Sequence, residues 1–320
     1  MKKGVKIMVK DSLMTVPKDA IGPTLIEIAK KDGKVVVLSS DVSISCNVEM
    51  FHEKFQDRFF EMGIAEQSTM SVAGGFATEG FKPYYVALAI FSCGMTWAQT
   101  RQICNSNLNV KIIGTHAGVD DGQDGSGHHA TEDIAISRAL PRMVVLTPGD
   151  EVEVRAALYA LSKYEGPAYM RVAREPQTII HNTDYTFEIG KADIIFDEGK
   201  EFAIVYEGSA QEEAVKGYNL LKERGISGKL IAIRSIKPID EDTLKDLAKN
   251  VKVIVTVENH SVVGGLYSAI CEKVVNCNTG VKIKPIAFAD EFMESGRAVD
   301  IKNKYGMSSE KIYECVMEEI

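Results

Sequence analysis

The fold is decided by a stretch of the chain that reads Lys34-Val35-Val36-Val37-Leu38-Ser39-Ser40-Asp41. A short apolar run that ends in small and polar residues is typical of a parallel strand buried on both faces. Similar runs recur along the chain, separated by helical stretches such as residues 150–164. They lie at residues 84–88, 110–114, 143–146 and 167–172. Strands that alternate with helices predict a doubly wound α/β sheet.

The pattern breaks after residue 174 and then starts again. Residues 174–190 are polar and lack periodicity, which predicts a surface linker. A helix opened by a capping box at Ser209-Ala210-Gln211-Glu212 and a last helix over residues 309–319 are expected beyond it. The strands expected there are residues 202–206, 229–233, 251–257 and 281–286. We therefore expect two α/β domains, residues 1–178 and 191–320, with a linker over residues 179–190.

Composition excludes several classes of protein. The 320 residues carry a formal net charge of -8 without a dense Lys/Arg run, so nucleic acid is not an expected partner. No run of about 18 apolar residues predicts a membrane span. The six cysteines form no CxxC pair, which argues against a zinc site or a disulfide framework. Because the N-terminus lacks the apolar stretch of a signal peptide, we expect a cytoplasmic protein.

A first candidate segment surrounds Glu66, in Gly63-Ile64-Ala65-Glu66-Gln67. Glu66 lies near the start of a predicted helix, where a carboxylate either complements the helix dipole or takes part in a site. The same helix contains Gly74 and Gly75, each of which costs about 1 kcal/mol relative to alanine. Close approach of another backbone, in the core or across a subunit contact, is the expected reason for them.

A second candidate segment, residues 115–129, follows a predicted strand and precedes a predicted helix. This position is the carboxyl edge of a parallel sheet, where ligands bind. The segment holds three of the six histidines, three aspartates and four glycines. These residue types suit proton transfer and, less specifically, metal binding, although nothing in the spacing fixes a ligand geometry and no metal ligand is assigned. A solvated loop is the alternative.

Taken together, these segments resemble the C-terminal portion of transketolases, namely their pyrimidine-binding domain followed by their small C-terminal domain. The resemblance covers nearly the whole chain, and its specificity lies in the order and spacing of several short motifs. Those motifs are Ser40-Asp41-x-x-x-Ser45, Gly63-Ile64-Ala65-Glu66-Gln67, Ala87-Leu88-Ala89-Ile90-Phe91, Thr115-His116, Gly122-Gln123-Asp124-Gly125-x-x-His128, Arg174 and Glu294-Ser295-Gly296. It implies an enzyme that transfers a two-carbon ketol unit from a ketose to an aldose with thiamine diphosphate as cofactor.

The resemblance also implies how the cofactor is held. Glu66 would hydrogen-bond the ring nitrogen of its aminopyrimidine, which helps the exocyclic nitrogen to remove a proton from the thiazolium carbon. Leu88 and Phe91 would form a wall of the pyrimidine pocket, and Asp41 would lie near the cofactor at the subunit contact. From the residues alone, Phe91 is equally well explained as part of the core.

Substrate contacts follow from the same resemblance. His116 and His128 would act on the hydroxyl and carbonyl oxygens of the sugar, with Asp124 binding a hydroxyl group. Ser45 and Arg174 would bind the anionic tail of the sugar, since an arginine fork binds such groups in a bidentate way. A salt bridge of Arg174 with Glu175 or another neighbour is the alternative.

One family motif is absent from the chain. Full-length transketolases hold Mg²⁺ and the diphosphate with a Gly-Asp-Gly motif and a downstream asparagine pair, and no Gly-Asp-Gly occurs here. We therefore expect a split enzyme in which an N-terminal subunit holds Mg²⁺, with two copies of each chain in an α2β2 assembly. Activity is expected only with this partner.

Several positions depart from the family pattern. Lys18-Asp19 stands where the family has a Thr-Arg pair that binds the substrate phosphate, and Gln123 replaces a glutamate. These changes leave the sugar open and favour an unusual one, such as a sulfonated ketose. They also leave open a non-catalytic regulatory or assembly role. Two other thiamine-diphosphate enzymes share parts of the pattern, namely deoxyxylulose-phosphate synthases and the β subunits of 2-oxoacid dehydrogenases.

Overall fold

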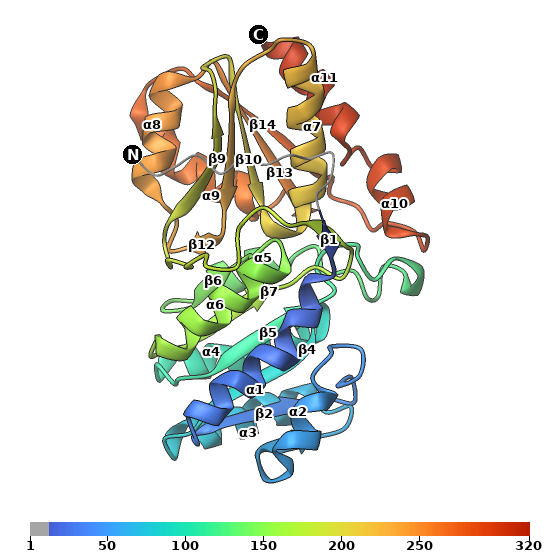
Figure 1. The fold of residues 1–320 in the computed structure, drawn as a ribbon, viewed down its shortest axis with the longest axis vertical. Coiled ribbons are helices and arrows are strands. Elements are labelled where there is room, and N and C mark those ends of the chain that lie inside the picture. Colours follow the sequence, from blue (N-terminus) through green and yellow to red (C-terminus); the bar gives the residue numbers. More distant parts are fainter. Residues whose placement is uncertain (1–12) are drawn as a thin grey trace.

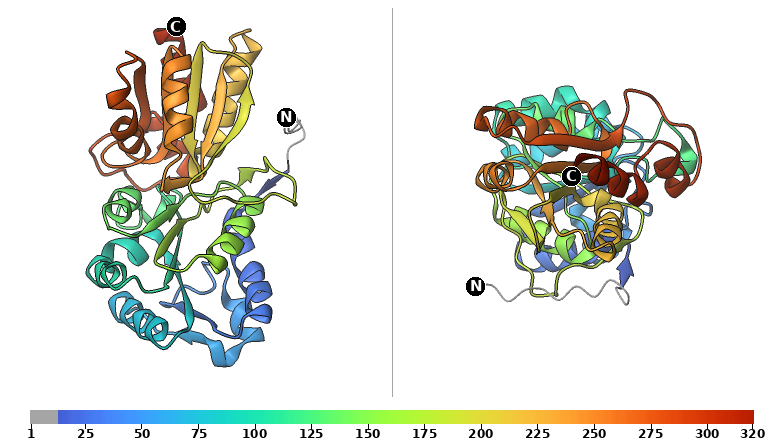
Figure 2. Two further views of the ribbon diagram at one scale, coloured as in Figure 1. Left: turned by 90° about the vertical axis from the view of Figure 1, so that its left-hand side faces the viewer. Right: turned by 90° about the horizontal axis from the view of Figure 1, so that it is seen from above.

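The computed structural model describes residues 13–320, which form two α/β units stacked along the long axis of the molecule (Figures 1 and 2). The first unit is built on a seven-stranded sheet in the order β12-β6-β7-β5-β4-β2-β3. The second is built on a five-stranded sheet in the order β14-β13-β10-β11-β9. The predicted fold class, two doubly wound α/β domains, is confirmed.

Six strands of the first sheet are parallel. They are β2 (Val35–Ser39), β3 (Phe59–Glu61), β4 (Lys82–Leu88), β5 (Lys111–Thr115), β6 (Val144–Leu146) and β7 (Ala168–Arg171). All residues of β2 are buried, as are those of β5 and β7, which explains why these strands are continuous apolar runs in the sequence.

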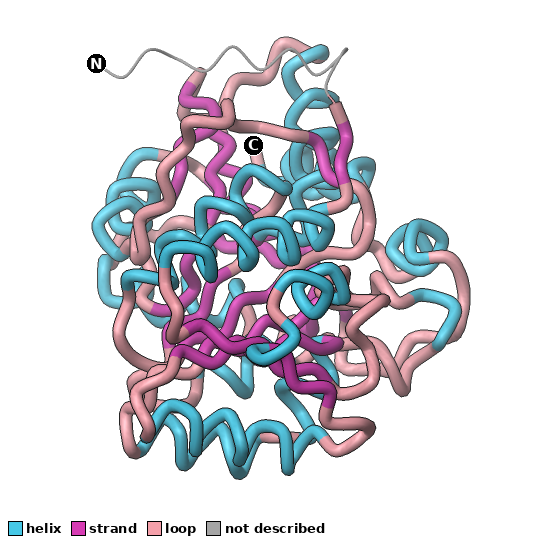
Figure 3. The backbone as a smooth tube through the Cα atoms, turned by 60° about the horizontal axis from the view of Figure 1, so that its bottom comes forward, coloured by secondary structure: helices cyan, strands magenta, loops and turns pink. Residues whose placement is uncertain are grey.

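Helices cover both faces of this sheet, as the cyan layers beside the magenta strands show (Figure 3). One face packs on α1 (Ile21–Lys31), α2 (Glu49–Lys54) and α6 (Glu151–Lys163). The other packs on α3 (Glu66–Thr78), α4 (Trp97–Asn105) and α5 (Asp133–Arg138). The side chains of Ile103 and Leu108 lie beside Gly74, whereas the space next to Gly75 is open. No second backbone closes on either glycine within residues 13–320, so the expected reason for them is not found inside the chain.

The second unit is likewise a mainly parallel sheet with helices around it, but it has fewer strands. Its strands are β9 (Ala192–Asp197), β10 (Phe202–Glu207), β11 (Lys229–Ile233), β13 (Val253–Ser261) and β14 (Lys282–Phe288). Its helices are α7 (Gln211–Glu223), α8 (Glu241–Asn250), α9 (Leu266–Val274), α10 (Ala298–Lys304) and α11 (Ser309–Glu319). Strand β9 pairs antiparallel with β11, and the other pairs of this sheet are parallel.

The predicted capping box of α7 is wrong. The hydroxyl of Ser209 donates to Glu207 at 2.6 Å and accepts from buried Arg171 at 2.6 Å, so it does not cap the helix. The amide of Glu212 donates instead to Gln177, in the segment between the sheets. Tertiary contacts, with the buried Arg171–Glu207 ion pair and with Gln177, therefore replace the local capping contact that the four residues suggested.

The segment between the sheets is also less exposed than predicted. Strand β8 (Gln177–Thr178) pairs antiparallel with β1 (Met14–Thr15), and Ile180 and Phe187 are buried. Strand β12 (Ser235–Lys237), from the second unit, adds antiparallel to β6 at the edge of the first sheet. Residues 182–184 are exposed, as expected of a surface linker, whereas Ile180 packs into the core of the second unit and Phe187 into that of the first.

Candidate active site

The predicted site residues gather at one edge of the first sheet. Its six parallel strands point the same way, so their carboxyl ends lie together, and the residues that follow them meet there. Asp41 and Ser45 follow β2, Glu66 follows β3, Phe91 follows β4 and His116 follows β5. Arg174 follows β7, and Leu88 is the last residue of β4.

Glu66 is the first residue of α3 and is only 7% exposed. Hydroxyl contacts hold the first turn of α3 against the sheet: the Ser40 hydroxyl lies 3.1 Å from that of Thr69 in α3 and 3.0 Å from that of Tyr85 in β4. Among the described residues, no hydrogen bond or ion pair involves the Glu66 carboxylate. Since this carboxylate makes no bond within the described chain, it is free to accept a hydrogen bond from a ligand.

Phe91 and His128 form the aromatic part of the site. Their ring centroids lie 5.3 Å apart at an interplanar angle of 78°, an edge-to-face contact. Phe91 belongs to a π-helical turn, Ile90–Met95, that follows β4, and such turns are frequent at functional sites. Phe91 also packs against the core, so both interpretations of this residue describe part of its surroundings.

His116 is buried and has a left-handed backbone conformation, with φ of 59°. Its Nδ1 lies 2.8 Å from the hydroxyl of Thr115, which sets the ring orientation. Burial, with the positive charges of Arg174 and Lys18, lowers the pKa of His116 to about 4. The ring is therefore neutral near pH 7 and able to donate or accept a hydrogen bond.

Arg174 is paired with Asp121. A guanidinium nitrogen lies 2.9 Å from Asp121 Oδ1, while nearly half of the arginine side chain stays exposed. Burial and the charge of Asp124 raise the pKa of Asp121 to about 6, although Arg174 opposes this. Asp121, Asp124 and Arg174 line a polar cavity of about 340 Å³ whose far wall is Gly296–Val299 of the second unit.

Asp41, Ser45 and Lys18 make fewer contacts with the rest of the protein than the residues above. Asp41 is exposed with φ of 61°, and its amide donates to Glu61 at 2.6 Å. Ser45 is exposed, and its hydroxyl makes no hydrogen bond within the part of the chain that the structure describes. Lys18 is 3.6 Å from Asp19, and its positive charge contributes to the lowered pKa of His116.

Asp120 and Asp121 were not singled out as site residues from the sequence. Three aspartates in a glycine-rich loop were the available signal, but only the structure separates their environments. Asp120 is 2% exposed and ties the loop to the second unit, Asp121 faces Arg174, and Asp124 is exposed. Neighbouring residues of one loop therefore have different surroundings, which spacing alone does not reveal.

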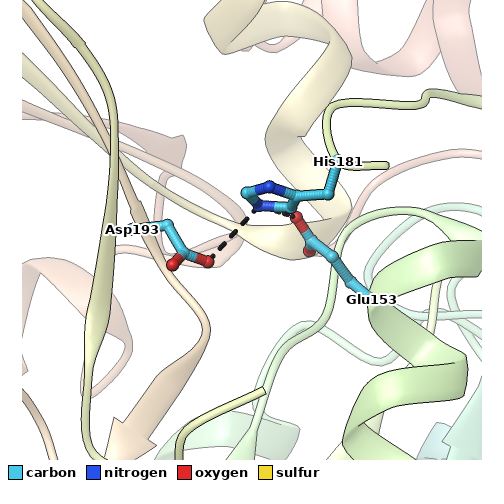
Figure 4. Close-up of side chains that lie close together, drawn as sticks. All are labelled: Glu153, His181 and Asp193. Atoms are coloured by element: carbon cyan, nitrogen blue, oxygen red, sulfur yellow. Dashed lines mark ion pairs between the residues drawn. The ribbon is translucent and has the colours of Figure 1, made fainter. Parts of the chain in front are cut away.

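A second cluster of titratable residues lies between the two units. His181 Nε2 is 3.2 Å from Glu153 of α6 and 3.5 Å from Asp193 of β9 (Figure 4). Although these residue types could bind a metal ion, Arg234 already contacts the Glu153 carboxylate at 2.5 Å and Tyr185 donates to Asp193 at 2.6 Å. Burial opposes the charge of His181, but the nearby carboxylates of Asp193 and Glu153 raise its pKa to about 9. The cluster is therefore an ion-pair contact between the units.

Comparison with known proteins identifies the family to which both units belong. Residues 16–177 match the family described as "Transketolase, pyrimidine binding domain", and residues 190–312 match "Transketolase, C-terminal domain". The chain belongs to the transketolase family. It corresponds to the C-terminal section: it is 39% identical, over 93% of its length and 94% of the relative, to a protein of Methanocaldococcus jannaschii named for that section.

Two further relatives of the transketolase chain carry substrate names. It is 30% identical to the 6-deoxy-6-sulfo-D-fructose transketolase subunit of a Clostridium species, covering 94% of this chain and 93% of the relative. It is 31% identical to one of the subunits of the apulose-4-phosphate transketolase of Phocaeicola vulgatus, covering 92% and 94%. Among solved structures, a split-gene transketolase described as an inactive β4 tetramer superposes with a TM-score of 0.85 at 33% identity, covering 95% of this chain and 97% of that one.

No helix among residues 13–320 has both the length and the apolar character needed to cross a bilayer.

Proposed function

We propose that this chain is the C-terminal subunit of a thiamine-diphosphate-dependent transketolase, which moves a two-carbon ketol unit from a ketose to an aldose. The observation that carries the proposal is Glu66, a mostly buried residue whose carboxylate has no partner in the described chain and which lies at the carboxyl edge of a transketolase sheet. Family membership over nearly the whole chain supports it.

The residues at this edge fit the pyrimidine half of the cofactor. Glu66 offers a carboxylate for the ring nitrogen, and Leu88 and Phe91 offer apolar surface for the ring. Asp41 lies on the neighbouring loop. The chemistry that thiamine diphosphate supplies in this family is a nucleophilic carbon for cleaving the bond beside a carbonyl group. Glu66 would hold a proton at the pyrimidine nitrogen, which is the role that a carboxylate in this position can perform.

Two histidines, His116 and His128, would interact with the oxygen atoms of the sugar. Because its pKa is about 4, His116 would act as a neutral hydrogen-bonding group toward substrate oxygens. His128 is half-buried in edge-to-face contact with Phe91, and it would exchange protons with the substrate. Asp124 is exposed on the same loop, where it would accept a hydrogen bond from a sugar hydroxyl.

The anionic tail of the sugar would meet Arg174, with Ser45 and Lys18 on adjacent loops. A phosphate or a sulfonate would both suit an arginine, and the two named relatives act on one substrate of each kind. Lys18 provides a point charge without a planar fork, so it replaces a second arginine incompletely. This favours a tail that carries less charge than a phosphate.

The diphosphate and Mg²⁺ would be held by a separate N-terminal subunit, since the chain contains no Gly-Asp-Gly motif. Support for such a partner comes from the relatives named as subunits or as a section, and from the split-gene structure. An assembly with two copies of each chain is the expected form.

A binding titration tests this proposal. Thiamine diphosphate and Mg²⁺ are added to this chain alone, to the partner alone and to the mixture, while circular dichroism or intrinsic fluorescence is recorded. Saturable binding is expected in the mixture and should weaken when Glu66 is changed to alanine. Binding that is the same for the partner alone and for the mixture would contradict a cofactor site shared by the two chains.

A further inference from the structure

The loop that carries the proposed substrate residues is held by the second unit of the chain. Asn259, in β13, receives a hydrogen bond from the amide of Val119 at 3.0 Å and donates to the carbonyl of Ala117 at 3.2 Å. A Cβ added at Gly118 would lie 2.1 Å from the Asn259 side chain, so the contact is close-packed. Ser295 and Gly296 bond the same loop farther along, at Gln123 and Gly122.

Asp120 is the centre of this contact. Its Oδ1 accepts from Asn259 at 2.9 Å and lies 3.4 Å from the ammonium of Lys302 in α10. Its Oδ2 accepts from the backbone amides of Arg174 at 3.0 Å and Glu175 at 3.2 Å. One buried carboxylate therefore joins the second unit to the backbone of the proposed anion-binding arginine. Figure 1 shows α10 beside this loop.

Asn259 and Lys302 are themselves rigidly placed. The backbone of Asn259 donates to Glu207 at 3.0 Å and accepts from Arg171 at 2.6 Å, and both of these side chains are buried. Lys302 is 3% exposed and also lies 3.2 Å from Glu213 of α7. Burial opposes its charge, but Glu213 and Asp120 outweigh burial and raise the pKa of Lys302. A buried ion pair with this many partners fixes geometry more than it adds stability.

We propose that Asn259 and Lys302 are positioning residues that act through Asp120 to hold Arg174 in place for the anionic end of the substrate. The inference rests on the proposed function, and it gives the second unit a specific task in substrate selection. Neither residue touches the substrate. Their loss should therefore weaken tail binding and leave the reacting end of the sugar unaffected.

The test uses the reconstituted two-subunit enzyme and three donors: D-xylulose 5-phosphate, 6-deoxy-6-sulfo-D-fructose and the uncharged L-erythrulose. The variants are Asn259→Ala and the double variant Lys302→Met/Glu213→Gln, which removes the lysine without leaving the Glu213 carboxylate unpaired. Arg174→Gln is the reference for direct loss of the tail contact. Lys222→Gln, which removes an exposed lysine paired with Glu198, is the matched control.

Both positioning variants should raise KM for the two anionic donors about tenfold, the scale of one charge-assisted hydrogen bond, with kcat little changed. KM for L-erythrulose should stay within about twofold of wild type, and adding Asn259→Ala to Arg174→Gln should cost nothing further, since Asn259 acts only through Arg174. A general loss of structure would affect all three donors equally and would overturn the inference, as would an unchanged KM for the anionic donors. Should the double variant not fold, Asn259→Ala carries the test alone.

The outcome separates the inference from the function it rests on. Wild-type enzyme that turns over none of the donors contradicts the proposed function. Active wild-type enzyme in which Arg174→Gln raises the anionic KM values, but the positioning variants do not, contradicts the inference only.

Discussion

The guanidinium of Arg174 lies 2.9 Å from a carboxylate oxygen of buried Asp121, so the proposed anion-binding arginine is already paired before any substrate arrives. An incoming sugar tail must compete with this carboxylate for the same charge. Because the pKa of Asp121 is raised to about 6, the competition should weaken below that pH.

A pH-dependent KM follows from this pair. For a sulfonated ketose, whose tail keeps its charge across this range, KM should fall as pH drops from 7 to 5, since protonated Asp121 releases Arg174. Asp121→Asn should lower KM at pH 7 several-fold, a part of one charge-assisted contact, and remove the pH dependence. Steady-state kinetics of the reconstituted enzyme measure both. A KM that rises in Asp121→Asn would mean that Asp121 orients Arg174 for the tail.

Glu66→Gln keeps the shape of the side chain and removes the carboxylate. The rate should fall at least about a hundredfold, the scale of one acid–base contribution, because glutamine cannot share a proton with the pyrimidine. Single-turnover rates measure this, and thermal unfolding provides the control for folding. Near-normal activity would make Glu66 a helix-dipole residue only.

Lys18 and Asp19 should limit the use of ordinary sugar phosphates. Lys18 offers no bidentate contact, and Asp19 repels a dianion. We expect higher kcat/KM on a ketose with a sulfonated or uncharged tail than on fructose 6-phosphate or xylulose 5-phosphate. Changing Lys18 to arginine should raise kcat/KM on the phosphates. A clear preference of the unmodified enzyme for the phosphates would show that Lys18 or the partner subunit supplies the missing contact.

His181 links the two units in a pH-dependent way. Its pKa in the folded state, about 9, exceeds the ordinary value of 6.5. Its stabilising contribution is therefore fully present below pH 6.5 and is lost as pH rises through 9. From pH 7 to 9.5 the wild type should lose roughly 2 kcal/mol more unfolding free energy than His181→Gln, the equivalent of one to two pKa units. Denaturant titrations measure this, with the exposed His52→Gln as the control. Parallel pH curves for wild type and His181→Gln would refute it.

The central strands were predictable because a strand that is buried on both faces needs apolar residues at consecutive positions, which appear as an unbroken run in the sequence. Residues 229–233 coincide with β11, and residues 34–38 differ from β2 by one residue. Short edge strands such as β12 were not predictable. Its three residues are held by pairing with β6 of the other unit, which no local pattern encodes.

The candidate site was predictable as a set of loops and not as a set of contacts. Residues that follow parallel strands must share an edge, which places Glu66, His116 and Arg174 together. The partner of Arg174 depends on tertiary geometry. The alternative of a salt bridge with Glu175 named the right interaction, but Asp121, 53 residues earlier in the chain, is the acid that makes it.

We propose that this chain supplies half of a split active site. The most direct measurement is ketol-transfer activity of this chain alone, of the diphosphate-binding subunit from the same genome alone, and of the two mixed with thiamine diphosphate and Mg²⁺. We expect negligible turnover by either chain alone, and activity that rises with the added partner to a fixed stoichiometric ratio. Full turnover by the highly purified chain without any partner would contradict it.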